Sequence, residues 1–414
     1  MTEPPPISLT SSQRFLLAIL SSTPLTRPGD RKDIRWDDFL RLAGGLGVVP
    51  FVAHVVREDD LGFPAPVREQ ILAGGRANAM RQLRRHAALR EIARSLDGAG
   101  IPLIVLKGMA LAYLAYPDPY CRSMSDIDLF VPRADVERAA ELVGRLDYRG
   151  SRNFFSQDGS TLVSSDKSVQ IEVHGSLPSF EDVGVDSAFL WERSLPADLD
   201  GIQVRVLRPE DCVQHLCLHT GAHHHYLSRL QGLLDLRVYL EKYGDAMQWQ
   251  AVAERSVETG SSAWVYLTLW LARELLRAPV PAAFFQSCPA PARLDELSGL
   301  ATRHLLSLSD LPLTSSFVRV CAGGSFKERW DVVREHWRQA GPRIHRAENP
   351  REANALGAGG YLRLFLRRMK FFVRSGALRP SAWRAAAEYR VSRAHLLNLM
   401  DNQAQSPPRS SPGG

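Results

Sequence analysis

The stretch RSMSDIDLFV, residues 122–131, places two aspartates on either side of an isoleucine at the start of an apolar run. An extended chain turns successive side chains to opposite faces, so Asp126 and Asp128 share one face. Ile127 and Leu129 then point into the core. Buried charge is costly without a partner. The stretch therefore predicts a strand whose aspartates lie at a strand end or around a cation.

A second segment, VQIEVHGSL at 169–177, alternates apolar and polar residues and predicts another strand. The same alternation puts Glu172 and His174 on one face. If the two strands are neighbours, about 4.8 Å apart, Glu172 meets Asp126 and Asp128. Such a cluster is favourable around one or two hard divalent cations with oxygen ligands, most naturally Mg²⁺, with Mn²⁺ as the alternative.

A third segment supplies positive charge. Leu106, Lys107 and Gly108 end a short apolar run and precede a helical pattern. A helix that opens there has free backbone N–H groups at its positive end, which suits a phosphate. Gly108 has no Cβ, so the backbone can approach a ligand closely. Lys107 and Arg122 could add charge beside a triphosphate.

The organisation along the chain predicts an α+β protein, in which a small mixed β-sheet core is enclosed by N- and C-terminal helical regions. The 414 residues suggest two or three domains. Apolar periodicity and turn residues place strands at 101–106, 126–131, 169–177 and 202–207. We expect a helical region over 1–98, an α/β core over 99–207, a second helical region over 208–400 and a disordered tail over 401–414.

Composition indicates a cytoplasmic protein. The five cysteines are odd in number and irregularly spaced, which argues against a disulfide framework. No apolar stretch has the length of a membrane span, and the first residues lack a signal-peptide pattern. The net charge of +6 is concentrated after residue 342, so it says little about the rest of the chain.

The run LKGMALAYLAYPDPYCRSMSDIDLFV, followed by IEVHGSL, resembles the nucleotidyltransferase superfamily that includes DNA polymerase beta. It is more similar to a bacterial branch of uncharacterised nucleotidyltransferases. That branch has Lys-Gly, an Arg shortly before Asp-x-Asp, and an acidic residue two positions before a His. The likeness continues through HLCLHTGAHHHYLSRLQGLLDL, a His-rich helix that leads to Asp235, and covers roughly residues 10–300.

The resemblance implies a Mg²⁺-dependent enzyme that moves a nucleotidyl group from an NTP, such as ATP, to an acceptor. It assigns catalysis and metal binding to three carboxylates: Asp126, Asp128 and Glu172. Nucleotide binding falls to three further residues: Lys107, Gly108 and Arg122. Three residues are expected to orient these groups or to contact substrate: His174, His219 and Asp235.

Two positions depart from the superfamily pattern. Met109 follows Gly108 where Ser is usual, and Glu172 stands where Asp is commoner. A non-catalytic regulatory protein that binds a nucleotide or nucleic acid on the same fold therefore stays open, as does transfer of another phosphate-linked group such as a sugar. The acceptor is unidentified: a small molecule, a peptide and a protein all fit, and nucleic acid is less favoured.

Two other patterns have simpler interpretations. Cys212, His215 and His219 share a helical face, but their spacing fits no zinc motif, so contacts to phosphate or substrate are favoured over a zinc site. In a helix expected over 361–374, basic residues lie opposite an apolar face. A packed helix with a solvated basic side is favoured there over polynucleotide binding.

Overall fold

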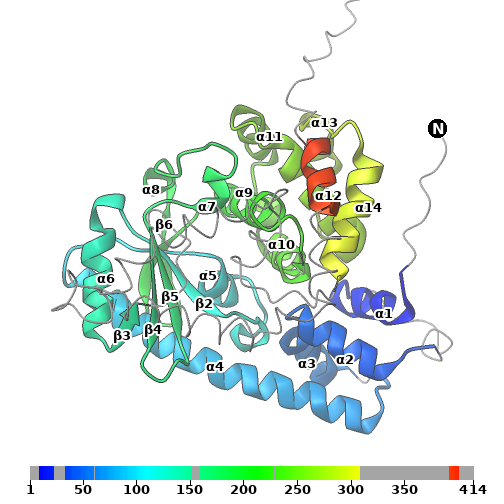
Figure 1. The fold of residues 1–414 in the computed structure, drawn as a ribbon, viewed down its shortest axis with the longest axis horizontal. Helices are drawn as coiled ribbons and strands as arrows, with labels where there is room; N and C mark the ends of the chain where they lie inside the picture. The colour runs from blue at the N-terminus through cyan, green and yellow to red at the C-terminus, as the bar shows by residue number, and fades with distance from the viewer. Residues whose placement is uncertain are drawn as a thin grey trace, which may run out of the picture.

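The computed structural model describes residues 9–22, 33–59, 61–150, 159–227, 229–307 and 391–400, and the structural statements below concern these residues. The predicted α+β fold is confirmed. One mixed β-sheet lies beside two groups of helices that come from opposite ends of the chain (Figure 1). The helix expected over 361–374 and the tail over 401–414 lie outside the described residues.

The sheet has seven strands in the order β3-β4-β5-β2-β1-β7-β6. Parallel pairing joins β2 to β5 and β1 to β7, and the other neighbours are antiparallel. The strands are β1 (Ile104–Val105), β2 (Asp126–Phe130), β3 (Tyr148–Gly150), β4 (Gly159–Ser164), β5 (Gln170–His174), β6 (Leu195–Asp198) and β7 (Gln203–Val206). All four expected strands are present. The strands β3, β4 and β6 were not predicted from the sequence.

One face of the sheet is apolar. Ile127 and Leu129 of β2 and Ile171 of β5 are fully buried on it. They share a core with apolar residues of α4 (Ala65–Asp97), α5 (Lys107–Leu114) and α6 (Val136–Arg145). The opposite face of β2 and β5 therefore carries the polar residues of both strands, as the alternation predicts.

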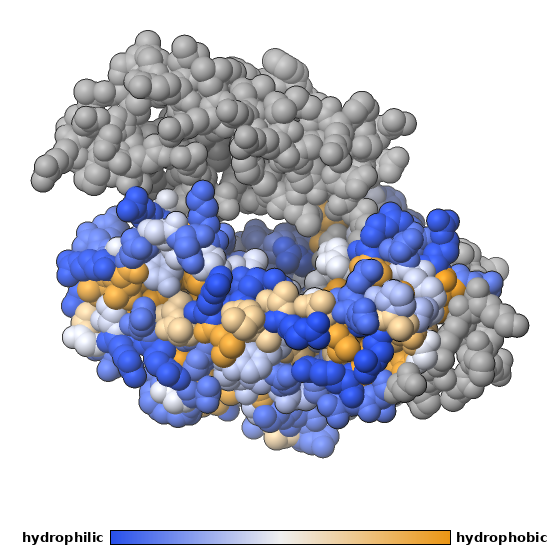
Figure 2. All heavy atoms as spheres, turned by 90° about the horizontal axis from the view of Figure 1, so that it is seen from below, coloured by the Kyte–Doolittle hydropathy of each residue, from blue (hydrophilic) through white to orange (hydrophobic). Residues whose placement is uncertain are grey.

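The N-terminal helices are α1 (Ser11–Leu20), α2 (Trp36–Gly45), α3 (Val49–Glu58) and the 33-residue α4. Gly74 and Gly75 let α3 pack closely on α4, because an added Cβ would lie 2.7 Å from the Val49 side chain and 2.6 Å from that of Ala53. In Figure 1, α4 runs from these helices along the lower side of the sheet. Figure 2 looks onto this side from below and shows mainly hydrophilic residues with scattered hydrophobic ones.

Most of the remaining helices follow β7. They are α9 (Pro209–Leu218), the π-helical turn η4 (His219–His223), α10 (Leu230–Tyr243), α11 (Trp249–Glu258), α12 (Ser262–Leu276), α13 (Ala282–Ser287) and α14 (Leu294–Leu306). Residues 391–400 form a further helix. A single apolar core joins α9–α14 to α1–α3. Within the described part of the chain, no helix has the length and apolar character needed to cross a bilayer.

Short elements connect these parts. Between β1 and β2 lie α5 and a 3₁₀ turn, η2 (Pro119–Cys121). A second 3₁₀ turn, η3 (Arg133–Asp135), precedes α6, while α7 (Pro178–Glu181) and α8 (Leu190–Arg193) link β5 to β6. A third turn, η5 (Gly244–Ala246), follows α10. Lys107 begins α5 directly after β1, and η2 precedes β2, so both elements position residues near the polar face of β2 and β5.

Candidate active site

The register of β2 against β5 brings the predicted carboxylates together. The two strands are parallel neighbours, with Asp128 opposite Glu172 and Phe130 opposite His174. The expectation that the two strands lie side by side is thus confirmed. Asp128, Glu172 and His174 have ligand atoms that all lie within 4.8 Å of one another. Asp126, the first residue of β2, stands outside this tight group but interacts electrostatically with Asp128.

Lys107 supplies the positive charge closest to the cluster. Its Nζ lies 2.9 Å from Asp128 Oδ1 and 3.1 Å from His219 Nε2. Burial lowers the pKa of this amine, but the charges of Asp128, Asp126 and Glu172 raise it further, so the net pKa is above the ordinary value. Lys107 is therefore a partly buried ammonium ion at the first residue of α5, directed at the acidic group.

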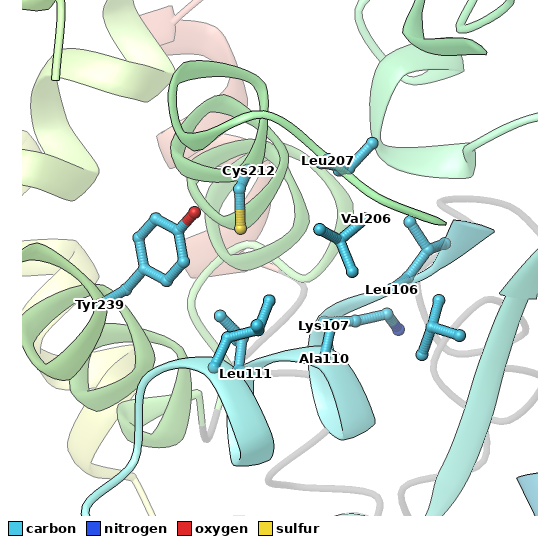
Figure 3. Close-up of a pocket in the computed structure, with 10 residues that line it drawn as sticks. Leu106, Lys107, Ala110, Leu111, Val206, Leu207, Cys212 and Tyr239 are labelled. Carbon is cyan, nitrogen blue, oxygen red and sulfur yellow. The ribbon is translucent and has the colours of Figure 1, made fainter. Parts of the chain in front are cut away.

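Figure 3 shows the Lys107 amine pointing away from Cys212 and Tyr239. Those two side chains belong to a small pocket that also involves β1, α5 and β7 and is lined mostly by apolar residues. The amine thus leaves this apolar pocket on the side of β2, where its partner Asp128 lies.

Negative charge is in excess at the cluster. Burial and the charge of Asp128 raise the pKa of both Asp126 and Glu172. Asp128 behaves differently: burial alone would raise the pKa of its carboxyl, but Lys107 and His174 hold it below the ordinary value. Carboxylates that repel one another in this way are stabilised by a divalent cation. The donor set, carboxylate oxygens with one imidazole nitrogen, fits such an ion.

Gly108 and Met109 follow Lys107 at the start of α5. No side chain caps this helix, since its N-cap is Leu106. A Cβ on Gly108 would lie 3.3 Å from Arg122 Nη1, so a larger residue would crowd that guanidinium. Met109 is 1% exposed in the apolar core behind the sheet. At this end of α5, groups available to a phosphate are therefore backbone N–H groups and the amine of Lys107.

Arg122 and Asp235 form a buried ion pair with each other. Arg122 Nε and Nη2 donate to the two Asp235 oxygens at 2.8 and 2.7 Å. Tyr116 and Gln231 also donate to Asp235, at 2.7 and 3.1 Å. Burial lowers the pKa of Arg122, but Asp235 raises it further, to a net value above the ordinary one. This pair ties α10 to the segment before β2, and the nucleotide-binding and substrate roles expected for its members stay predictions.

His219 belongs to a chain of polar contacts that ends at the cluster. Its Nε2 contacts Lys107 Nζ and lies 3.2 Å from His224 Nε2, while Arg229 Nη2 is 3.2 Å from His224 Nδ1. The turn that carries His219 is π-helical, a form that occurs frequently at functional sites. Among the residues that the structure describes, only Asp128, Glu172 and His174 could group around a metal, so the His-rich helix gains no support as a zinc site.

Three polar residues of α4, not predicted from the sequence, hold the segment before β2. Asn78, Gln82 and Arg85 are 0, 3 and 4% exposed. Asn78 donates to the carbonyls of Tyr120 and Arg122 at 2.8 and 3.0 Å, and Gln82 donates to the Arg122 carbonyl at 3.0 Å. Arg85 donates to the Ser125 carbonyl at 3.2 Å. Their spacing puts them on one face of the helix, and this pattern could have indicated that the face is buried. It was not recognised because a long Arg-rich helix has the composition of a solvent-exposed one.

Comparison with known proteins agrees with this geometry. A family model described as "uncharacterised nucleotidyltransferase" matches residues 32–277, more than half of the chain. The chain belongs to this family. The expectation of a nucleotidyltransferase, and so of a transferase enzyme, is confirmed. No curated protein matches the chain.

The α4 contacts of this nucleotidyltransferase predict a stability effect. Replacing Asn78 with Ala leaves the Tyr120 carbonyl without its amide donor and the Arg122 carbonyl with Gln82 as its remaining amide donor, so we expect the free energy of unfolding to fall by about 1–3 kcal/mol. Urea unfolding measures this loss. Gln70→Ala, at an exposed position of the same helix, is the matched control and should change stability by less than about 0.5 kcal/mol. Equal effects of the two substitutions would contradict a stabilising role for the hydrogen bonds from Asn78 to the segment before β2.

The transferase should also lose stability in acid. Burial lowers the pKa of His215 to about 3, against about 6.5 in an unfolded chain. Its contribution is complete above pH 6.5 and is lost as the pH falls toward 3, because only the unfolded state takes up the proton. We expect His215→Gln to weaken the pH dependence by up to about 1.4 kcal/mol per pH unit. Urea unfolding between pH 7 and 5 measures it, and equal slopes in both proteins would contradict this origin.

Proposed function

We propose that this protein transfers a nucleotidyl group from an NTP, such as ATP, to an acceptor. We also propose that it acts in the cytoplasm and belongs to the bacterial branch of the DNA polymerase beta-like superfamily. The observation that carries the proposal is the register of β2 and β5, which pairs Asp128 with Glu172 next to the ammonium group of Lys107. This acidic group beside an uncapped helix N-terminus suits a metal-bound triphosphate.

In this proposal, Asp126, Asp128 and Glu172 hold Mg²⁺ or Mn²⁺. The metal would supply positive charge that offsets the charge of the phosphates. Lys107 and the first backbone N–H groups of α5 hold the triphosphate. Lys107 contacts Asp128 at 2.9 Å in this structure, so it moves from the carboxylate to a phosphate when a nucleotide binds. His219, which contacts the same amine, keeps it near the site.

The proposed reaction is a substitution at the α-phosphorus. An oxygen of the acceptor forms a bond to the α-phosphorus, and the bond from this phosphorus to the α–β bridging oxygen breaks. Pyrophosphate leaves with the bonding electrons, and Glu172 takes the proton of the acceptor hydroxyl. A small molecule, a peptide or a protein with a free hydroxyl can serve as acceptor.

Calorimetry with the Mg²⁺ complexes of the four non-hydrolysable NTP analogues tests the donor side of the proposal. We expect at least one analogue to bind, and we expect EDTA to weaken its binding at least tenfold, because the carboxylates repel a metal-free triphosphate. Asp38→Asn is the control, because Asp38 is a surface residue of α2 that pairs with Arg41. This variant should bind the analogue with the affinity of the wild type. Equal affinity with and without EDTA would contradict the metal-dependent proposal.

A further inference from the structure

His174 lies deeper in the sheet than Glu172 and faces the same way. It is the last residue of β5, two positions after Glu172, and it is 7% exposed. Alternation along the strand turns both side chains to the face that carries Asp128. The residue that borders Asp128 and Glu172 on this side is therefore a buried imidazole.

The distances around His174 are slightly longer than those expected of ligands to one ion. Its Nε2 lies 3.2 Å from Asp128 Oδ1 and 3.6 Å from Glu172 Oε2. Donor atoms at adjacent positions around an ion with bonds of about 2.1 Å are about 3.0 Å apart. A small closure of the Glu172 side chain would thus allow all three atoms to bind one cation. Nε2 is the nitrogen aimed at the carboxylates, whereas Nδ1 is buried and has no hydrogen-bond partner among the residues that the structure describes.

A nitrogen ligand changes which ion a site prefers. Mg²⁺ takes oxygen ligands and keeps much of its water, while imidazole is a common ligand of first-row transition metals. Two carboxylates with one imidazole resemble the mixed oxygen and nitrogen sets that bind such metals. The same arrangement without a bond to the metal would only orient Asp128 through a hydrogen bond.

We propose that His174 binds the metal directly through Nε2, together with Asp128 and Glu172, and that the site therefore favours a divalent first-row transition ion such as Mn²⁺ over Mg²⁺. This inference rests on the proposed function, since it concerns the same metal. It replaces the orienting role expected for His174 from the sequence. Asp126, outside the tight group, would then serve a second ion or the nucleotide-bound metal.

Electron paramagnetic resonance of bound Mn²⁺ distinguishes a ligand from an orienting residue, because a directly bonded ¹⁴N couples to the electron spins. Mn²⁺ is added to the full-length protein without nucleotide, and electron spin-echo modulation is recorded. We expect a coupling from one directly bonded imidazole in the wild type and its loss in His174→Gln. His54→Gln is the matched control, because this imidazole belongs to α3 and lies beside the ring of Phe51. It should keep the coupling.

Competition adds a second readout. Mg²⁺ is titrated against bound Mn²⁺ in the wild type and in His174→Gln, and we expect the preference for Mn²⁺ to fall at least tenfold in the variant. Melting curves in EDTA check that both variants fold. Bound Mn²⁺ with oxygen ligands only would overturn the inference and leave the proposed transfer intact. Retention of the coupling in His174→Gln would overturn it as well. A wild type that shows the nitrogen coupling but binds none of the NTP analogues in calorimetry would instead count against the proposed function.

Discussion

Replacing Asp126 with Asn is expected to lower nucleotidyl transfer by about a thousandfold or more while the protein stays as stable as the wild type or becomes slightly more stable. The amide keeps the shape of the side chain but removes a charge that the proposed metal and triphosphate need. Burial and Asp128 already raise the pKa of this carboxyl, so its charge costs stability in the metal-free protein. NTP turnover in Mg²⁺ and thermal melting in EDTA measure the two effects.

Asp128→Asn serves as the comparison. It should lose transfer to a similar extent, but it should also lose stability, because the buried Asp128 is the ion-pair partner of the partly buried Lys107. Repulsion between the two aspartates by itself would predict a gain in stability when both are replaced with Asn, and the contact to Lys107 changes that expectation for Asp128. Wild-type turnover by Asp126→Asn, or its failure to fold, would contradict the assignment of this residue to catalysis.

The second large effect is expected at the ion pair of Arg122 and Asp235. Replacing Asp235 with Ala leaves a buried guanidinium without its carboxylate, which typically costs about 3–5 kcal/mol. We therefore expect the free energy of unfolding to fall by that amount in urea denaturation. The surface pair of Arg41 and Asp38 offers a control, because Asp38→Ala should cost less than about 1 kcal/mol.

A double substitution separates the pair from its neighbours. Arg122→Met combined with Asp235→Leu removes both charges and keeps apolar volume, so most of the stability lost in Asp235→Ala should return. Coupling between the two sites, measured by a double-mutant cycle, should exceed about 1 kcal/mol. No coupling would show that Asp235 acts mainly through Tyr116 and Gln231, which also donate to it.

The sequence predicted the parts of the site that follow from local periodicity. Alternation in residues 126–131 and 169–177 was enough to put Asp128 and Glu172 on one face, and the register confirms that they are paired. Lys107 was placed beside them because a Lys-Gly step ended a strand. In the structure its amine contacts Asp128 directly. These predictions succeeded because strand geometry leaves few alternatives.

Long-range partners could not be predicted in the same way. Arg122 carried no sign in sequence that a carboxylate 113 residues away would hold it. Asn78, Gln82 and Arg85 are polar residues in a helix, and only the tertiary structure shows that they reach carbonyls of the segment before β2. The edge strands β3 and β6 were missed because strands of three and four residues have weak apolar patterns. The inner strand β4 was missed because Leu162 and Val163 are its only large apolar residues.

The most direct test of the central proposal follows the fate of each phosphate of the NTP. Protein, Mg²⁺ and an NTP labelled at the α- or the γ-phosphorus are incubated with and without a cell extract as the source of acceptor. We predict that the wild type cleaves between the α- and β-phosphorus, so that pyrophosphate carries the γ-label and the α-label passes to water or to an acceptor. Asp126→Asn should lose this cleavage. Release of γ-labelled inorganic phosphate with an NDP, or equal pyrophosphate formation by both proteins, would contradict the account.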